Sequence, residues 1–197
     1  MSVRLTLLSA AAPVERDIRF GDTPLDEAAL RAARALPASL RTAAVLYVAP
    51  SQRCHQTAQA LGAREFTEEP ALRDLDTGRW EGRSPAEIVA ADQAAFAAWM
   101  TDPEAAPHGG ESVADLCRRV AAWLEGMPDD VGRVVAVVEQ AVARAAVLHA
   151  LAAPVGSFWR VDVPPLAAVR LTGRSGRWNL RLETLAAARD DEAVSGV

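Results

Sequence analysis

The chain has 197 residues, of which half are hydrophobic and 24% are charged, and its formal net charge is -5. This length and composition suit one globular domain with a sizeable core. The acidic balance provides no basic surface for a phosphate backbone, and the 21 basic residues, all arginine, are scattered along the chain, so the composition argues against nucleic acid as a partner.

The sequence also limits the compartments and cofactors that can be expected. No apolar run approaches the roughly 20 residues that span a bilayer, and the N-terminal residues lack a signal-peptide pattern. Cys54 and Cys117 are too few for a disulfide framework and lack metal-ligand spacing, and no phosphate-binding glycine loop or dinucleotide fingerprint occurs. Arginine in place of lysine, with abundant alanine, is typical of a GC-rich genome. We therefore expect a cytoplasmic bacterial protein with no membrane partner, no metal and no cofactor.

The elements that can be predicted first are buried strands that alternate with helices. Three short apolar runs rich in Val and Leu, at 3–8, 44–48 and 133–138, are typical of strands covered on both faces of a parallel sheet. Spaced apolar residues among good helix formers predict helices at 25–36, 51–61, 112–124 and 141–151. This alternation predicts an α/β fold.

A further helical stretch lies between the second and third of these strands. Ser84 is a predicted N-cap, Pro85 is suited to the first helical position, and Glu87 to the third. The stretch that they open reaches about Met100. We expect residues 84–105 to be a helical cap inserted into the domain.

The C-terminal part predicts a hairpin and then a tail. Residues 167–171 and 177–182 have strand patterns and flank a glycine-containing loop at 172–176, which predicts an antiparallel edge hairpin. From residue 186 the chain is polar and acidic, with too little apolar surface to fold alone, which predicts disorder for 186–197. The predicted domain is therefore 1–185.

Three motifs occur in a fixed order along the chain. Arg53 precedes Gln56-Thr57-Ala58, then Leu72-Arg73-Asp74 stands ahead of Gly78 and Trp80-Glu81-Gly82, and Gly109-Gly110-Glu111-Ser112 follows. Their order and separation resemble the histidine phosphatase superfamily, also called phosphoglycerate-mutase-like, over about residues 3–183. The resemblance implies a three-layer α/β/α domain with a mostly parallel sheet, an antiparallel edge strand and a helical insertion.

The resemblance fails at the two positions that carry the family's catalytic histidines. The family has Arg-His-Gly after the first strand, where histidine is the nucleophile, and Ser-His-Gly after the last buried strand. This chain has Ser9-Ala10-Ala11 and Val138-Glu139-Gln140 there, and its first histidine is His55. The resemblance therefore implies a pseudoenzyme, a degenerate member that lacks both catalytic histidines.

A candidate site remains at these strand ends. In an open parallel sheet, ligands bind beyond the carboxyl ends of the strands, which predicts a pocket lined by five residues: Ser9, Ala10, Arg53, Asp74 and Glu139. The resemblance gives Arg53 a phosphate-binding role and places Asp74 where the family has a glutamate that protonates the leaving group. A proton donor at Asp74 requires a pKa raised by burial or by Glu139, whereas the alternative is a simple ion pair with Arg53. Arg53, Asp74 and Glu139 sum to about one negative charge, which disfavours a phosphate dianion.

The three histidines allow different interpretations. His55, two residues after Arg53, is expected on a helix surface, and His149, ten residues beyond Glu139, is expected to be structural. His108 lies in the glycine loop near the expected site entrance and is a candidate ligand-binding residue. Glu111 at the end of this loop is expected to support the start of the next helix.

Three functional hypotheses follow. The leading one is a degenerate protein that binds a small, anionic molecule or a protein partner through the pocket or the cap. The alternative is a repurposed isomerase, dehydratase or cyclase, in which Asp74 and Glu139 act as acid and base while Arg53 holds an anionic substrate. The third is a residual phosphatase that uses His108. The hairpin edge and the cap leave a homodimer open.

Overall fold

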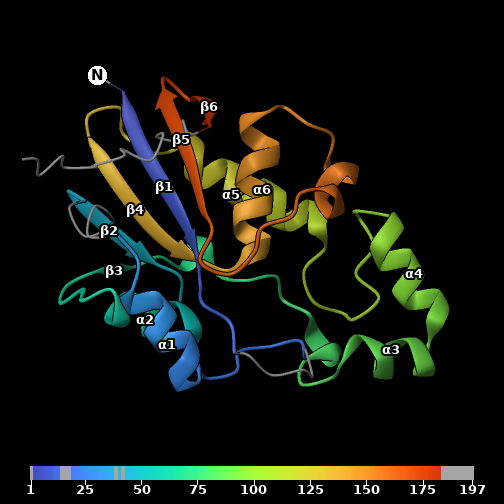
Figure 1. Cartoon of the computed structure of the whole chain (residues 1–197). Coiled ribbons are helices and arrows are strands. Elements are labelled where there is room, and N and C mark those ends of the chain that lie inside the picture. Colours follow the sequence, from blue (N-terminus) through green and yellow to red (C-terminus); the bar gives the residue numbers. More distant parts are fainter. Residues whose placement is uncertain (1, 14–18, 38–39, 41–42, 183–197) are drawn as a thin grey trace, which may run out of the picture.

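The computed structural model describes residues 2–13, 19–37, 40 and 43–182, and its centre is a six-stranded sheet in the order β3-β2-β4-β1-β5-β6 (Figure 1). Neighbours among β3, β2, β4 and β1 are parallel, whereas β5 is antiparallel to β1 and β6 to β5. The bounds in chain order are β1 Val3–Ser9, β2 Val45–Val48, β3 Thr67–Glu68, β4 Arg133–Val138, β5 Ala168–Arg174 and β6 Arg177–Arg181. The predicted fold class, a mostly parallel sheet with an antiparallel edge, is confirmed.

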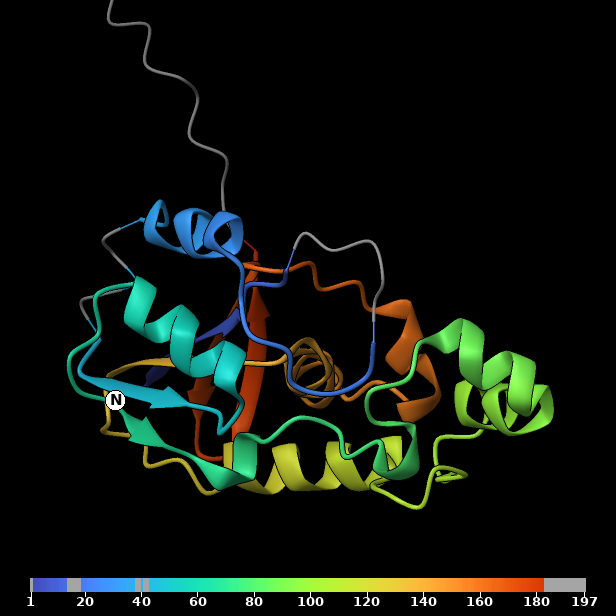
Figure 2. The same ribbon diagram turned by 90° about the horizontal axis from the view of Figure 1, so that it is seen from below.

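Helices cover both faces of the sheet. Helices α1 and α2 pack together on one face, and α5 and α6 pack together on the other (Figures 1 and 2). Right-handed crossovers explain this division, because the connections that lead toward β3 and those that lead away from it must cross opposite faces. The helix bounds are α1 Glu27–Arg34, α2 Gln52–Ala60, α3 Pro85–Ala91, α4 Gln93–Thr101, α5 Val113–Glu125 and α6 Gln140–Ala150.

Strand β4 forms the middle of the core because both of its faces are covered. Its residues from Val134 to Val138 are all buried, which is why the sequence shows a continuous apolar run instead of an alternating one. In the parallel register with β1, Ser9 lies opposite Val138. The carboxyl ends of β1 and β4 therefore meet at one edge of the sheet, as the sequence predicted.

The helical insertion consists of two short helices instead of one long one. The Ser84 hydroxyl and the Glu87 carboxylate form a capping box at the start of α3. Asp92 then ends α3 and caps α4, where its side chain accepts a hydrogen bond from the Ala95 backbone N–H. The insertion is anchored by a separate aromatic core that includes Trp80, Ile88 and Trp99.

The hairpin is tighter than the sequence predicted. Residues 172–174, expected in the loop, extend β5, and only Ser175 and Gly176 form the turn, both with positive φ. Position 173 within the strand requires glycine, because a Cβ there would lie 2.7 Å from atoms of the Trp178 ring. The two-residue strand β3 was not predicted, since both of its residues are exposed and polar.

Two boundary predictions concern the ends of this fold. The predicted disordered tail, 186–197, lies outside the described residues, and the domain boundary at 185 stays a prediction. Among the residues that the structure describes, no helix is long and apolar enough to cross a membrane.

Candidate active site

Small buried residues form the end of β1. Ser9 and Ala10 are buried, and the Ala10 backbone N–H donates a hydrogen bond to the Val138 carbonyl, which joins β1 to β4 beyond their last paired residues. The next N–H, that of Ala11, donates to the Thr57 hydroxyl on α2 at 3.0 Å. Within the described part of the chain, the buried Ser9 hydroxyl has no hydrogen-bond partner. The end of β1 is thus held by backbone hydrogen bonds and carries only small side chains.

Glu139 occupies the junction between β4 and α6 and points toward α2. Its Oε1 accepts hydrogen bonds from the Ser51 hydroxyl at 2.7 Å and from Arg53 Nε at 3.1 Å. The side chain is only 8% exposed, and it does not cap its own helix. Glu139 therefore joins the junction after β4 to the first turn of α2.

Arg53 is surrounded by three carboxylates. Besides Glu139, Asp74 Oδ2 lies 4.0 Å from its Nη2, and Asp22 Oδ1 lies 4.0 Å from its Nε. Burial opposes the charged guanidinium, but Glu139, Asp74 and Asp22 together raise the pKa of Arg53 above its ordinary value. The structure thus brings together Arg53, Asp74 and Glu139, as the strand ends predicted.

Asp22 was missed by the sequence analysis. It accepts hydrogen bonds from the backbone N–H groups of Gln52 and Arg53, at the N-terminus of α2. A carboxylate is favoured there by the helix dipole. The available signal, an aspartate between a glycine and a threonine, is found in many loops and gives no indication of its partner 30 residues away.

Asp74 is the carboxyl group best suited to donate a proton. Burial, and then the negative charge of Glu139, raise its pKa to about 7, although the Leu75 N–H, Arg53 and Arg119 favour the ionised form. The sequence analysis left open whether Asp74 is a proton donor or an ion-pair partner of Arg53. The 4.0 Å approach to Arg53 is longer than the Glu139 contact, and the raised pKa favours the proton donor.

The loop that carries Asp74 is held from α5. Arg119 donates hydrogen bonds to the carbonyls of Ala71 and Arg73, at 2.7 and 3.0 Å, and to that of Asp74 at 3.4 Å. The same guanidinium binds both carboxylate oxygens of Glu111, at 2.9 and 2.6 Å. The prediction that Glu111 supports the helix start is wrong in its mechanism: Ser112 caps α5, and Glu111 pairs with Arg119.

Cys54 is adjacent to the site but unsuited to nucleophilic attack. Its Sγ lies 3.7 Å from Glu139 Oε1. Burial, and then the charge of Glu139, raise the pKa of the thiol well above its ordinary value. The thiolate that a cysteine nucleophile requires is therefore disfavoured.

The structure does not bring His108 to the other predicted site residues. Its ring is buried in the core of the insertion, with ring-centroid distances of 5.0 Å to Trp80 and 6.2 Å to Trp99. Its Nδ1 accepts a hydrogen bond from the Gly110 N–H, and burial lowers its pKa. His108 therefore packs the glycine loop against the insertion through the contacts of its ring with Trp80 and Trp99.

The other two histidines lie where the sequence predicted. His55 Nε2 lies 3.0 Å from Glu68 Oε2, and its ring packs on Phe66. His149 Nε2 lies 3.8 Å from Glu125 Oε1, near the end of α6. His149 lies at the far end of α6 from the strand ends, whereas His55 lies in the first turn of α2 and pairs with Glu68 at the end of β3. These contacts with surface carboxylates support structural roles for both.

A second arginine, on the helix that follows β4, was not singled out by the sequence analysis. Arg144, on α6, donates a hydrogen bond from Nε to the Val161 carbonyl at 2.9 Å. Its guanidinium carbon lies 5.8 Å from the Phe158 ring centroid and 5.7 Å from that of Trp159. The sequence offered one signal for Arg144, its position five residues after Glu139. Its aromatic partners could not be predicted, because the segment that contains them has no helical or strand periodicity.

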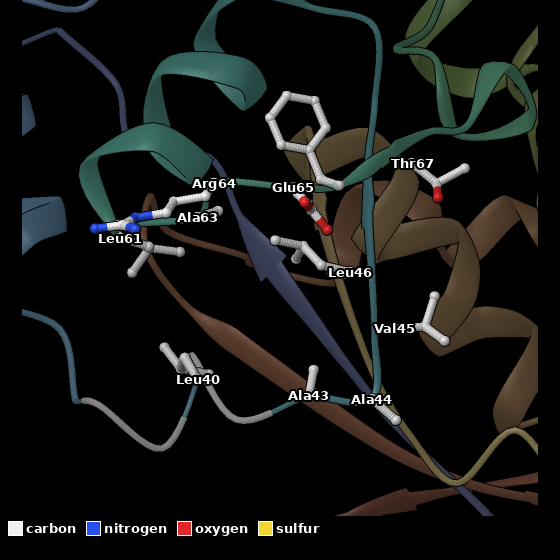
Figure 3. A pocket seen from close by; sticks show the side chains of 12 residues that line it. Leu40, Ala43, Ala44, Val45, Leu46, Leu61, Ala63, Arg64, Glu65 and Thr67 are labelled. Atoms are coloured by element: carbon white, nitrogen blue, oxygen red, sulfur yellow. The ribbon is translucent and has the colours of Figure 1, made fainter.

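One hollow in the described part of the chain lies away from these residues. It has a volume of about 680 Å³ and is bounded by the start of β2, the end of α2 and the segment that leads into β3 (Figure 3). Arg53 lies at the other end of α2, in its first turn. The hollow is therefore separate from the candidate active site.

The mostly parallel sheet between two helical layers, with Arg53 and Asp74 next to the carboxyl ends of its strands, matches the phosphoglycerate-mutase-like α/β fold. The model of the Histidine phosphatase superfamily (branch 1) matches residues 14–185, so the chain belongs to this superfamily. An adenosylcobalamin/alpha-ribazole phosphatase of Salmonella typhimurium is 30% identical over 149 residues, 72% of this chain and 74% of that protein.

Two further similarities involve glucosyl-3-phosphoglycerate phosphatases. The protein of that name from Mycolicibacterium vanbaalenii is 39% identical over 71 residues, which span about a third of each chain. The native structure of a mycobacterial glucosyl-3-phosphoglycerate phosphatase has a TM-score of 0.76 and 27% identity, covering 93% of this chain and 99% of the other. Each of these relatives is named as a phosphatase.

These names contradict the functional expectations drawn from the sequence. They point to phosphatase function, so the expected degenerate binding protein and the expected isomerase, dehydratase or cyclase are both wrong. The residual phosphatase that depends on His108 has no support in the geometry, because that ring lies in the aromatic core. The sequence-based expectation rested on the residues at the two strand junctions alone, whereas Arg53, Asp74 and Glu139 lie together at the strand ends.

Proposed function

We propose that the chain is a phosphomonoester hydrolase of the histidine phosphatase superfamily that lacks the two catalytic histidines and uses water as its nucleophile. The observation that carries the proposal is Asp74, a carboxyl group with a pKa of about 7 that lies 4.0 Å from Arg53 at the strand ends. The names of the relatives support phosphate esters as substrates. The residues Ser9-Ala10-Ala11 and Glu139, at the two junctions, support the absence of a histidine nucleophile.

Each of the three groups has one role in this reaction. Arg53 binds oxygens of the phosphoryl group through its guanidinium. Glu139 accepts a proton from water as the water oxygen forms its bond to phosphorus, and Asp74 donates its proton to the ester oxygen as the old bond to phosphorus breaks. The products are the alcohol and inorganic phosphate. Exchange with solvent then returns the proton from Glu139 to Asp74.

The charges at the site are compatible with a bound phosphate when Asp74 holds its proton. Protonation of Asp74 removes one of the negative charges near Arg53. The side chains of Asp22 and Asp74 are 37% and 38% exposed, so water partly screens both of these carboxyl groups. Glu139 makes no side-chain hydrogen bond to the first turn of α6, an 11-residue helix whose N-terminus favours an anion. The net charge of about minus one that was expected from the sequence counted Asp74 as ionised and left out the N-terminus of α6. With both effects included, the site is less negative than that.

The activity is tested by phosphate release from p-nitrophenyl phosphate and a panel of sugar and glycerol phosphates, from pH 5 to 9. We expect Arg53→Ala to reduce kcat/KM by about 100-fold, the loss expected for one charged contact to the transferring group. Arg64→Ala, which alters an exposed arginine just beyond α2, is the matched control and should leave turnover unchanged. Thermal melting checks that each variant is folded.

The proposal is overturned by either of two outcomes. One is the absence of phosphate release by the folded wild-type protein with every ester of the panel. The other is release that Arg53→Ala and Arg64→Ala affect equally, which would identify a contaminating phosphatase. The bacterial and cytoplasmic origin inferred from composition stays a prediction.

A further inference from the structure

Glu139, the base of the proposed reaction, is bound through only one of its two carboxylate oxygens. Its Oε1 accepts the Ser51 hydroxyl at 2.7 Å and Arg53 Nε at 3.1 Å, and the Cys54 thiol lies 3.7 Å from the same atom. Within the described part of the chain, Oε2 accepts no hydrogen bond, and it is not one of the fully buried polar atoms that lack a partner. Solvent therefore reaches Oε2, and this oxygen is the one that can take a proton from water.

The direction of the hydrogen bond between Ser51 and Glu139 is fixed by the rest of the Ser51 environment. Ser51 is the N-cap of α2, and its Oγ accepts the Cys54 backbone N–H at 3.2 Å. A hydroxyl has a single proton, and a carboxylate oxygen only accepts. The proton of Ser51 therefore points to Glu139, while its lone pair caps the helix.

The donors that hold Glu139 come from the beginning of one helix. Ser51 caps α2 and Arg53 lies in its first turn, whereas Glu139 lies at the junction between β4 and α6. The same helix is joined to the end of β1, because the Ala11 N–H donates to the Thr57 hydroxyl at 3.0 Å. Helix α2 is thus fixed against the strand ends, and its N-terminus can hold the carboxylate in one orientation.

The two donors differ in how many tasks they have. In the proposed reaction the Arg53 guanidinium also binds the phosphoryl group, so Arg53 serves both the substrate and Glu139. The Ser51 hydroxyl donates to Glu139 alone. A variant at Ser51 can therefore disturb the base while the phosphate contact stays intact.

We infer that Ser51 is a positioning residue, whose hydroxyl holds Oε1 of Glu139 so that Oε2 faces the water that attacks phosphorus. Ser51 itself makes no contact with the substrate in this role and acts through Glu139. A small error in the direction of the base is costly, because proton transfer requires close alignment with the water. The inference rests on the proposed function, since it concerns the base of the same reaction.

The test replaces Ser51 by glycine, which removes the hydroxyl but is a tolerated N-cap. We expect kcat with p-nitrophenyl phosphate to fall about 10- to 100-fold, the effect of losing one hydrogen bond to a carboxylate. KM and the affinity for inorganic phosphate, measured by calorimetric titration, should stay close to the wild-type values because Arg53 is unchanged. Ser51→Thr keeps the hydroxyl and should restore most of kcat.

Ser84→Gly is the matched control. Ser84 is the N-cap of α3, and its hydroxyl also accepts a backbone N–H at 3.2 Å, from Glu87 in the insertion. This variant loses the same kind of helix cap without a change next to Glu139, so it should keep the wild-type kcat. Thermal melting compares the stability of the two glycine variants.

The possible failures can be distinguished. Turnover by the wild-type protein with an unchanged kcat in Ser51→Gly would overturn the inference and leave the proposed function intact. A loss that Ser51→Thr does not restore, or that Ser84→Gly shares, would overturn it in favour of a purely structural cap. Complete loss of turnover in folded Ser51→Gly would overturn it by identifying Ser51 as the nucleophile. Absence of phosphate release by the wild-type protein would overturn the proposed function and this inference together.

Discussion

The proton on Asp74 is held there by two physical effects that act in the same direction. Burial removes water that would stabilise the carboxylate, and the nearby Glu139 charge repels a second negative charge. Glu139 accepts hydrogen bonds from the Ser51 hydroxyl and from Arg53 Nε. The proposed reaction therefore uses Asp74 as the acid and Glu139, which accepts the hydrogen bonds of both side chains, as the base.

A pH profile tests the role of Asp74. Because its pKa is about 7 and the acid must be protonated, kcat/KM should fall about tenfold for each pH unit above this value. Asp74→Asn should reduce activity strongly and remove this dependence. The profile is measured with p-nitrophenyl phosphate and with an alkyl phosphate, whose poorer leaving group needs the acid more. An unchanged profile in Asp74→Asn would show that another group controls it.

The same pKa has a consequence for stability. The folded protein holds this proton more tightly than the unfolded chain, so the free energy of unfolding should decrease as pH rises from about 4 to 7. Asp74→Asn lacks the charge and should therefore gain stability relative to the wild-type protein above pH 7. Urea unfolding at several pH values provides this comparison on the same variant.

At the residue scale, sequence reasoning succeeded where a side chain follows directly from a strand end. Arg53, Asp74 and Glu139 were expected together because they follow or face the carboxyl ends of parallel strands. Asp22 and Arg144 were not expected, because their partners are set by tertiary packing of loops. His108 was misassigned since the attraction of the tryptophan rings for its own ring is not visible in a glycine-rich motif.

Helix α5 acts as the support of the Asp74 loop. The guanidinium of Arg119 is 13% exposed and donates hydrogen bonds to three backbone carbonyls of this loop as well as to the Glu111 carboxylate. Its neighbour Arg118 is 60% exposed and pairs with Asp115 and Glu104 at the surface. Adjacent residues on one helix therefore provide a buried positioning contact and an exposed control.

Replacing Arg119 by Met should affect both stability and the acid. The change removes the donor of three carbonyls and leaves Glu111 with only its 3.3 Å contact to Arg73, which should cost about 2 to 4 kcal/mol of unfolding free energy, within the range for a broken buried pair. Because Arg119 favours the ionised form of Asp74, its loss should raise the pKa of Asp74. The fall in kcat/KM should therefore move to higher pH. Arg118→Met should change neither measurement. An Arg119→Met profile identical to wild type would limit Arg119 to a structural role.

At the element scale, helix and strand positions were predicted well and their ends less so. The N-caps Ser51, Ser84 and Ser112 lie where the sequence placed the helix starts, because a hydroxyl that accepts a backbone N–H is a local signal. The break at Asp92 and the tight turn at Ser175 depend on backbone conformations with competing solutions. These features required the structure.

At the scale of the whole molecule, the topology determines which residues meet. The sheet order places β4 between β1 and β2, so that the loops after three strands open on one edge. The sequence predicted a mostly parallel sheet from alternating buried strands and helices, since parallel strands require crossovers, but it did not predict the order of the strands. It did not predict the phosphatase function that the relatives indicate, because a list of missing residues does not reveal what the remaining ones do together.

The stereochemical course at phosphorus tests the central claim most directly. A phosphorothioate monoester made chiral with oxygen isotopes is hydrolysed in water of a third isotope, and the configuration of the inorganic thiophosphate is determined. Direct attack by water, with Asp74 as acid and Glu139 as base, predicts inversion. Retention would require two successive displacements through a phosphorylated protein side chain and would contradict the account.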